Sequence, residues 1–471
     1  MNFSRIVEHW AHQRPDKVAL RFQGEAITYG ALWKRIAETT AALGVGRGER
    51  IAWLGYNHPR MLELLFAAAR VGAILVPLNW RLTAAEHRAI LADCTPRYLV
   101  AEDEFVEQAR ALGVPLGPSS PAAAAGAMHP AGVDSDDLLI VYTSGTTGRS
   151  KGAVLTQSAL LWNGFNSIHA HDLSQADHVL SALPMFHVGG LNNQTLPALQ
   201  AGATVTLHRR FEPGQWLADV AAQRPTLSLL VPAAMQAVIQ HPDWARTDLS
   251  SLRLLNTGSM VVPLSLIRAF HARGVPVGQI YGCTETAPIA TVLLREDAMR
   301  KEGSAGKPAA HCEVRLVDGE IQVRGPNVMR GYWNDPEATR AAFDGEWFRT
   351  GDLGRFDDEG FLWIMGRSKD VIISGGENIH PAELENVLAD CPAIAESAVI
   401  GIADPKWGEV PCACIVLKPG ARLTETEVLA LFRDRLARYK HPRRVLFLDS
   451  LPKNALGKVQ RFELRRRLGA G

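Results

Sequence analysis

The stretch Leu138-Leu-Ile-Val-Tyr-Thr-Ser-Gly-Thr-Thr-Gly-Arg-Ser-Lys-Gly-Ala153 decides the fold of this chain of 471 residues. Its beginning predicts a buried strand over 138–142, and the following loop is dense in Gly and hydroxyl residues. We call residues 143–151 the signature loop. Gly145 and Gly148 let backbone N–H groups approach a phosphate, and Lys151 adds positive charge. Hydroxyl donors come from Thr143, Ser144, Thr146, Thr147 and Ser150.

Two other interpretations of the signature loop fit its sequence less well. A flexible Gly/Ser linker does not follow an apolar strand with two consecutive Thr residues and a basic pair. The spacing also departs from GxxxxGK[ST], which disfavours a kinase or ATPase of the Walker type. We therefore expect a different nucleotide chemistry.

Short apolar runs alternate with helical stretches on both sides of the loop, which is typical of parallel sheets covered by helices. Further strands are predicted at 203–207, 227–231, 252–256 and 278–281, with a hairpin at 313–325. Residues 116–132 are rich in Pro, Ala and Gly and predict a surface connector. The pattern becomes rich in β-type residues near 354–366, and an independent run of strands and helices follows.

The predicted fold class is therefore α/β with two domains. Residues 1–366 form a large N-terminal body of several layers with mostly parallel sheets. Residues 367–471 form a small α+β domain.

Composition excludes several classes of protein. The formal charge of +1 gives no reason to expect nucleic acid as a partner. Residues 1–11 do not resemble a secretory signal, and no apolar run is long enough to span a membrane, so we expect a cytoplasmic protein. Cys412 and Cys414 are interpreted as part of a buried strand and not as a metal site. A homodimer is left open.

Six further motifs follow the signature loop in order, and together they resemble the acyl-adenylate-forming superfamily, in its acyl- and aryl-CoA ligase branch. They are PMFHVGG at 184–190, YGCTET at 281–286, GEIQVRG at 319–325 with Arg330-Gly-Tyr332, WFRTGDLG at 347–354, GRSKD at 366–370 and PKNALGK at 452–458.

The resemblance implies binding of ATP and AMP by residues that also have a physical reason to bind them. Glu285 follows a strand and a tight turn, where a carboxylate can meet a hard cation, and with Thr146 it is implied to hold Mg²⁺. Tyr281 offers a flat face to adenine, and Asp352 and Arg367 are implied to bind ribose. The other implied contacts are Thr143, Ser144, Gly145, Thr147, Gly148, Lys151, Gly258, Ser259, Met260, Gly282, Thr284, Ile364 and Lys458. At 258–260 the chain has Gly-Ser-Met where the family usually has a sequence nearer Gly-Gly-Ala-Pro.

The small domain supplies the implied moving parts. Lys458 is the catalytic lysine expected to bridge the acid and the α-phosphate, together with Glu285 and Thr146 in the catalytic set. The resemblance implies that the small domain is mobile, with its hinge at 367–370 and Lys369 at the hinge position. Coenzyme A contacts are expected at Gly376, Trp407, Tyr439 and His441, where His441 replaces an Arg common in related aryl-CoA ligases. The stretch 433–467 has 12 basic and 3 acidic residues, which favours a phosphorylated ligand.

The acid that would be activated is expected to have an uncharged tail. The windows implied to surround it (185–193, 232–236, 258–262 and 286–290) contain no Asp, Glu, Lys or Arg. The predicted pocket residues are His187, Val188, Asn192, Met235, Ala287 and Pro288. Aromatic and aliphatic acids both remain open, as do two rival functions: acyl transfer to a carrier-protein thiol, and a nucleotide-binding module without catalysis.

Overall fold

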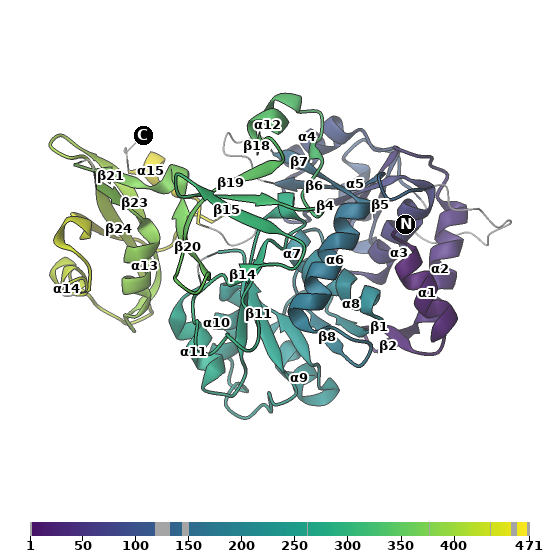
Figure 1. Cartoon of the computed structure of the whole chain (residues 1–471), viewed down its shortest axis with the longest axis horizontal. Helices are drawn as coiled ribbons and strands as arrows, with labels where there is room; N and C mark the ends of the chain where they lie inside the picture. Colours follow the sequence, from purple (N-terminus) through teal and green to yellow (C-terminus); the bar gives the residue numbers. More distant parts are fainter. Residues whose placement is uncertain are drawn as a thin grey trace.

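The computed structural model describes residues 2–117, 132–143, 150–260, 262–375, 377–433, 435–453 and 459–468. The predicted contacts Ser144, Gly145, Thr146, Thr147, Gly148, Gly376 and Lys458 lie outside these residues, as does most of the connector at 116–132. A large body built on three sheets is followed by a smaller C-terminal part that stands to one side of it (Figure 1).

The first sheet has nine strands in the order β14-β13-β12-β11-β10-β8-β9-β1-β2. The six central strands, from β12 to β1, run parallel, and the strands outside them are antiparallel. The bounds are β1 Val18–Phe22, β2 Glu25–Thr28, β8 His178–Ser181, β9 Thr204–Leu207, β10 Leu227–Leu229, β11 Leu254–Gly258, β12 Val277–Tyr281, β13 Thr291–Val292 and β14 Lys307–Pro308. The strands predicted at 203–207, 227–231, 252–256 and 278–281 are thus confirmed, with ends displaced by one or two residues.

The second sheet carries the signature loop and has the order β17-β7-β6-β4-β3-β5. Its strands are β3 Arg50–Leu54, β4 Ile74–Leu78, β5 Tyr98–Ala101, β6 Asp137–Thr143, β7 Lys151–Thr156 and β17 Gly331–Tyr332. Strands β3 to β6 run parallel, whereas β7 is antiparallel to both β6 and β17. The predicted strand at 138–142 is confirmed as β6.

Helices pack between and around these two sheets. Every residue of α3 except Arg70 is buried, and its apolar side chains share one core cluster with residues of both sheets. Pro59 in its first turn and Gly72 beyond its last residue, at φ 76°, set its bounds. The helices are α1 Arg5–Gln13, α2 Tyr29–Ala42, α3 Pro59–Val71, α4 Ala84–Cys94, α5 Val106–Arg110, α6 Gln157–His171, α7 Val188–Gly190, α8 Leu196–Ala201, α9 Pro213–Gln223, α10 Pro232–Gln240, α11 Leu264–His271 and α12 Pro336–Ala341, with short turns η1 Asp103–Phe105, η2 Leu191–Thr195 and η3 Thr284–Thr286.

A third, antiparallel sheet connects the body to the C-terminal part. It consists of β15 Glu313–Val317, β16 Glu320–Arg324, β18 Phe343–Asp344, β19 Trp347–Phe356 and β20 Leu362–Arg367. The pairing of β15 with β16 confirms the hairpin predicted at 313–325. Strand β20 runs into the turn η4 Ser368–Asp370, where the C-terminal part begins.

The C-terminal part has its own sheet and core. Its elements are β21 Ile372–Ser374, β22 Glu377–Ile379, α13 Pro381–Ala389, β23 Ile394–Asp404, β24 Gly408–Leu417, α14 Glu425–Ala430, η5 Arg438–Lys440, β25 Arg444–Phe447 and α15 Arg461–Arg467. Cys412 and Cys414 are buried in β24, so the predicted buried strand is confirmed. The mixed α/β class is confirmed for the chain as a whole. In the described residues, no helix has the length and apolar character needed to cross a membrane.

Candidate active site

The site begins where the parallel strands β11 and β12 end. Open α/β sheets bind ligands at the carboxyl ends of their strands. Gly258 is the last residue of β11, and a Cβ there would lie 2.4 Å from the carbonyl oxygen of Ile280, so only glycine fits beside β12. Ser259 follows at φ 73°, and Met260 is 43% exposed. Of the predicted contacts 258–260, Gly258 is thus paired with Ile280, which precedes Tyr281 at the end of β12.

Tyr281, Asp352 and Arg367 come together from two different sheets. The Tyr281 hydroxyl donates to Asp352 Oδ2 at 2.9 Å, and Arg367 Nε lies 2.7 Å from Asp352 Oδ1. Asp352 and Arg367 are directly paired between β19 and β20. Burial opposes the charge of Arg367, but Asp352 and neighbouring groups raise its pKa. The structure therefore brings together the three residues predicted to bind adenosine.

Glu285 lies in a tight turn between β12 and β13. A Cβ at Gly282 would lie 1.8 Å from the carbonyl oxygen of Pro288, so the chain folds back closely on itself here. The Thr286 hydroxyl donates within this turn and also accepts from the Cys283 N–H at 3.0 Å. Burial raises the pKa of the Cys283 thiol well above its usual value, and Glu285 acts in the same direction. The turn presents Glu285 next to the buried Thr284, as predicted.

The signature loop begins and ends close to Glu285. Thr143 and Lys151 form the terminal pair between β6 and β7. Lys151 Nζ lies 5.1 Å from the centre of the Tyr332 ring, and the Tyr332 hydroxyl donates to Glu285 Oε1 at 2.8 Å. Burial raises the pKa of Tyr332, as does Glu285. The role of Tyr332 was not predicted, although the motif containing it was a signal that could have found it.

The residues present fit a magnesium ion that is shared with phosphates. Among the described residues, no group of three or more His, Cys, Asp or Glu side chains could hold a metal by itself. Mg²⁺ usually takes one or two carboxylates together with substrate phosphates and water. Glu285 supplies such a carboxylate, half-buried and fixed by a hydrogen bond.

The predicted acid pocket is only partly assembled by the described contacts. Val188 and Ala287 are buried in one apolar cluster, whereas Met235 belongs to the neighbouring cluster that also includes Leu230. His187 Nδ1 accepts from the Gly189 N–H at 3.1 Å, and burial lowers its pKa to about 4.

Asn192 is a buried polar residue of this region. Its side chain is 1% exposed, and neither of its polar atoms has a hydrogen-bond partner among the described residues. Its carbonyl oxygen accepts from Asn163 Nδ2 at 2.7 Å, and Asn163 Oδ1 in turn accepts from the Ile289 N–H, which follows Pro288. A buried amide without partners is costly unless something else bonds to it.

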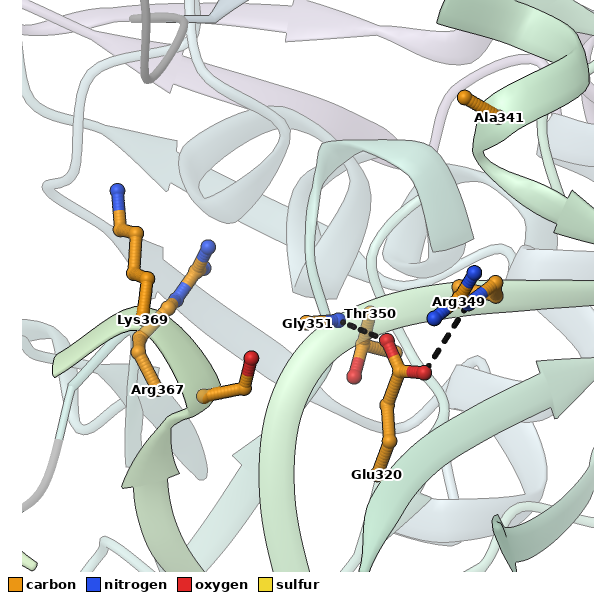
Figure 2. Close-up of a pocket in the computed structure, with 8 residues that line it drawn as sticks. Glu320, Ala341, Arg349, Thr350, Gly351, Arg367 and Lys369 are labelled. Carbon is orange, nitrogen blue, oxygen red and sulfur yellow. Dashed lines mark hydrogen bonds and ion pairs between the residues drawn. The ribbon is translucent and has the colours of Figure 1, made fainter. Parts of the chain in front are cut away.

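The predicted hinge residue, Lys369, lies between two residues that are held by ion pairs. Arg367 is held by Asp352, while Asp370 lies 3.5 Å from Arg461, which also binds Glu385 on α13 with two hydrogen bonds. Burial lowers the pKa of Lys369. A hollow of about 370 Å³ adjoins this turn (Figure 2), and its lining is Glu320, Ala341, Arg349, Thr350, Gly351, Arg367, Ser368 and Lys369.

The predicted coenzyme A residues lie within the C-terminal part. Trp407 is 40% exposed, and its carbonyl oxygen accepts from the N–H of Gly375 at 2.8 Å. Tyr439 is exposed in η5. His441 is half-buried, with Nε2 2.8 Å from the carbonyl oxygen of Leu436, so this ring is engaged inside its own domain.

The sequence of the signature loop, the fixed carboxylate of Glu285 and the Tyr281–Asp352–Arg367 cluster are together typical of an enzyme that uses a nucleotide to activate its substrate. Residues 7–333 match the family model described as AMP-binding enzyme, and residues 383–458 match the AMP-binding enzyme C-terminal domain. The chain belongs to the AMP-binding enzyme family.

Named relatives narrow the class. The chain is 48% identical to an indoleacetate–CoA ligase of Aromatoleum aromaticum, over 99% of this chain and 98% of the relative. It is 43% identical to a feruloyl-CoA synthase of an Amycolatopsis species, over 98% of this chain and 97% of the relative. The o-succinylbenzoate CoA synthetase of Bacillus subtilis, solved with its acyl-adenylate intermediate, has a TM-score of 0.90 at 33% identity and covers 98% of this chain and 97% of its own. The structure of the same Bacillus subtilis protein with ATP and a magnesium ion has a TM-score of 0.89 at 34% identity, and the match covers 98% of this chain and 99% of that one. The predicted class of carboxylic acid–CoA ligases is confirmed.

Proposed function

We propose that the chain is an AMP-forming ligase that joins a carboxylic acid with an uncharged tail to coenzyme A. The carrying observation is the Tyr281–Asp352–Arg367 cluster beside Glu285 and the ends of the signature loop. Groups suited to adenosine, a cation and phosphates thus come from three neighbouring sheets of the large body. The related ligases and the solved acyl-adenylate complex support the same reaction.

The adenosine part of ATP is proposed to bind to residues whose side chains are already oriented by contacts with one another. The Asp352 carboxylate has about four acceptor positions, so it can accept ribose hydroxyls while it keeps Tyr281 and Arg367. The Tyr281 ring, held through its hydroxyl, can stack on adenine. Gly258 has no side chain, so the backbone at the end of β11 can come close to adenine on the face opposite the Tyr281 ring. Thr284, Gly282, Ser259, Met260 and Ile364 complete the proposed contacts.

The first step makes the acid reactive. A carboxylate oxygen attacks the α-phosphorus of ATP, the bond from this phosphorus to the bridging oxygen breaks, and pyrophosphate leaves. Lys151, the signature loop and Lys458 neutralise the charge that would keep the two anions apart. Bound Mg²⁺, held by Glu285 and Thr146, would supply further charge neutralisation on the phosphates.

The second step requires a different face of the C-terminal domain. The sulfur of coenzyme A attacks the acyl carbon, the bond from this carbon to the AMP oxygen breaks, and the thiol proton is released to solvent. We place the rotation at Lys369, because Arg367 is anchored to the large body and Asp370 to the small domain. Gly376, Trp407, Tyr439 and His441 are the proposed coenzyme A contacts.

The acid pocket favours a carboxylic acid whose tail is uncharged and carries a hydrogen-bonding group. His187 is held uncharged at neutral pH because burial lowers its pKa to about 4. The buried amide of Asn192 has capacity to donate and to accept. The named relatives act on indoleacetate and on a feruloyl acid, and both are aromatic. An aryl acid with a hydroxyl or an N–H group is therefore the proposed substrate class.

Acid-dependent exchange of labelled pyrophosphate into ATP tests this function. A panel of aryl and aliphatic acids is assayed first without coenzyme A and then with it, with detection of the thioester. Exchange and coenzyme A thioester with the same acid are expected. Exchange without the thioester indicates a carrier-protein acceptor instead, and no exchange with any acid contradicts an adenylating enzyme.

A further inference from the structure

The segment Arg330-Gly-Tyr332 lies along the strand that leaves the signature loop. Gly331 and Tyr332 form β17 and pair with Val154 and Ala153 of β7. The N–H of Trp333 donates to the Gly152 carbonyl at 2.7 Å, and the N–H of Tyr332 donates to the Thr339 hydroxyl at 2.8 Å. The backbone of Tyr332 is thus fixed against the loop strand on one side and against α12 on the other.

From this position the Tyr332 side chain links the signature loop to Glu285. Its ring lies 5.1 Å from Lys151 Nζ, and its hydroxyl donates to Glu285 Oε1 at 2.8 Å. Lys151 starts β7, whereas Glu285 follows β12 of the other sheet. The Tyr332 side chain therefore contacts Lys151 in one sheet and Glu285 after a strand of another, and both residues are proposed to meet the phosphates.

The same segment also fixes the backbone around Glu285. The N–H of Met329 donates to the Glu285 carbonyl at 2.7 Å. Asn327, which is fully buried, donates through Nδ2 to the carbonyl oxygens of Thr286 at 2.6 Å and Ile289 at 2.8 Å. Backbone and carboxylate of Glu285 are thus held by one short stretch, 327–332, that is distant in sequence.

We propose that Tyr332 is a positioning residue that holds the Glu285 carboxylate in the orientation needed for a cation shared with the ATP phosphates. Free Glu side chains populate several rotamers, and a cation site is weakened when its carboxylate must be ordered on binding. Hydrogen-bonded partners of metal ligands typically contribute 10- to 100-fold to metal affinity or activity. The inference rests on the proposed function.

The variant Tyr332→Phe removes the hydroxyl and keeps the ring beside Lys151. Calorimetry would measure ATP affinity with excess Mg²⁺ and with EDTA, and AMP affinity separately. The gain in ATP affinity due to Mg²⁺ is expected to fall roughly 10-fold or more, with AMP affinity unchanged. In the half-reactions, adenylate formation should slow, whereas thioester formation from supplied acyl-AMP should keep its rate because it needs no pyrophosphate site.

Tyr142→Phe is the matched control. The Tyr142 hydroxyl donates to Asp93 Oδ2 at 2.6 Å, so this variant also removes one half-buried tyrosine–carboxylate hydrogen bond. It should lower stability without changing the Mg²⁺ dependence. The proposal is overturned if Tyr332→Phe retains the Mg²⁺-dependent gain, or if it slows both half-reactions equally. An inactive parent protein would instead contradict the proposed function, so the two failures are distinguishable.

Discussion

Arg367 Nε lies 2.7 Å from Asp352 Oδ1 because the two residues are paired across the antiparallel strands β19 and β20. Arg367 is the last residue of β20 and lies immediately before η4. The same Asp352 accepts the hydroxyl hydrogen of Tyr281 from the nine-stranded sheet. One carboxylate thus joins the strand before the proposed hinge to the strand end that is proposed to hold adenine.

Replacement of Arg367 with Met should weaken AMP binding about 10- to 100-fold, because it removes a charge-assisted hydrogen bond and leaves Asp352 without its cation. Titration calorimetry with AMP measures this directly. Arg355→Met on the neighbouring strand β19 is the control, since Arg355 is exposed and stacks on Trp363. Equal AMP affinity in the two variants would rule out a binding role for Arg367.

Much of this cluster could be predicted from the sequence, but its links could not. Apolar runs placed Tyr281 at a strand end, because these patterns depend on local chain geometry. The glycines on either side of Asp352 predicted a turn, and this was wrong, because Asp352 lies within β19 and is paired with Arg367. The hydrogen bond from Tyr332 to Glu285 spans 47 residues and depends on the pairing of β17 with β7. Two residues of strand carry too little periodicity to reveal that pairing.

Asn192 shows a second limit of sequence reasoning. A polar residue in an apolar segment can be exposed, satisfied or unsatisfied, and only the packing around it decides which. Asn163 uses its amide to bind the Asn192 backbone and Ile289, whereas the Asn192 amide has no partner in the described part of the chain. The sequence identified the residue but not its unused hydrogen-bonding capacity.

Lys458→Ala should abolish adenylate formation and spare thioester formation from supplied acyl-AMP, because its charge is needed only while two anions meet. Single-turnover assays of the two half-reactions measure this. Lys453→Ala, which removes an ion pair with Glu396 at 2.7 Å, should leave both rates near the parent values.

Lys369→Pro should give the opposite pattern to Lys458→Ala. Proline fixes φ at the proposed pivot, so adenylate formation should persist and thioester formation should slow by about tenfold or more. The two half-reactions are measured as before. Loss of the same step in both variants would contradict the assignment of separate domain orientations.

Stability should depend on pH through His187. Its pKa is about 4 in the folded protein, below the ordinary value of about 6.5 expected on unfolding. Between these values the unfolded chain binds a proton that the folded chain does not, so the free energy of unfolding falls as pH drops from about 6.5 to about 4. The loss is at most about 3 kcal/mol and is absent above that window.

His187→Gln should reduce this pH dependence. Urea unfolding at pH 7 and pH 5 measures the free energies, with the exposed His12→Gln as control. The difference between the two pH values should shrink for His187→Gln and stay unchanged for the control. Parallel curves for all three proteins would show that His187 does not titrate in this window.

Asn192→Leu should remove discrimination between acids that differ by one polar group. If the buried amide bonds to a hydroxyl or N–H of the acid, the parent protein should prefer a hydroxylated aryl acid to its deoxy analogue by roughly 10- to 100-fold in kcat/KM. The leucine variant should bring this ratio close to one, because no buried polar atom is then left unpaired with the analogue. ATP affinity in the absence of acid should not change, which separates a pocket effect from a loss of folding. An unchanged ratio would mean that Asn192 does not contact the substituent, and the substrate class would then have to be assigned from another wall of the pocket.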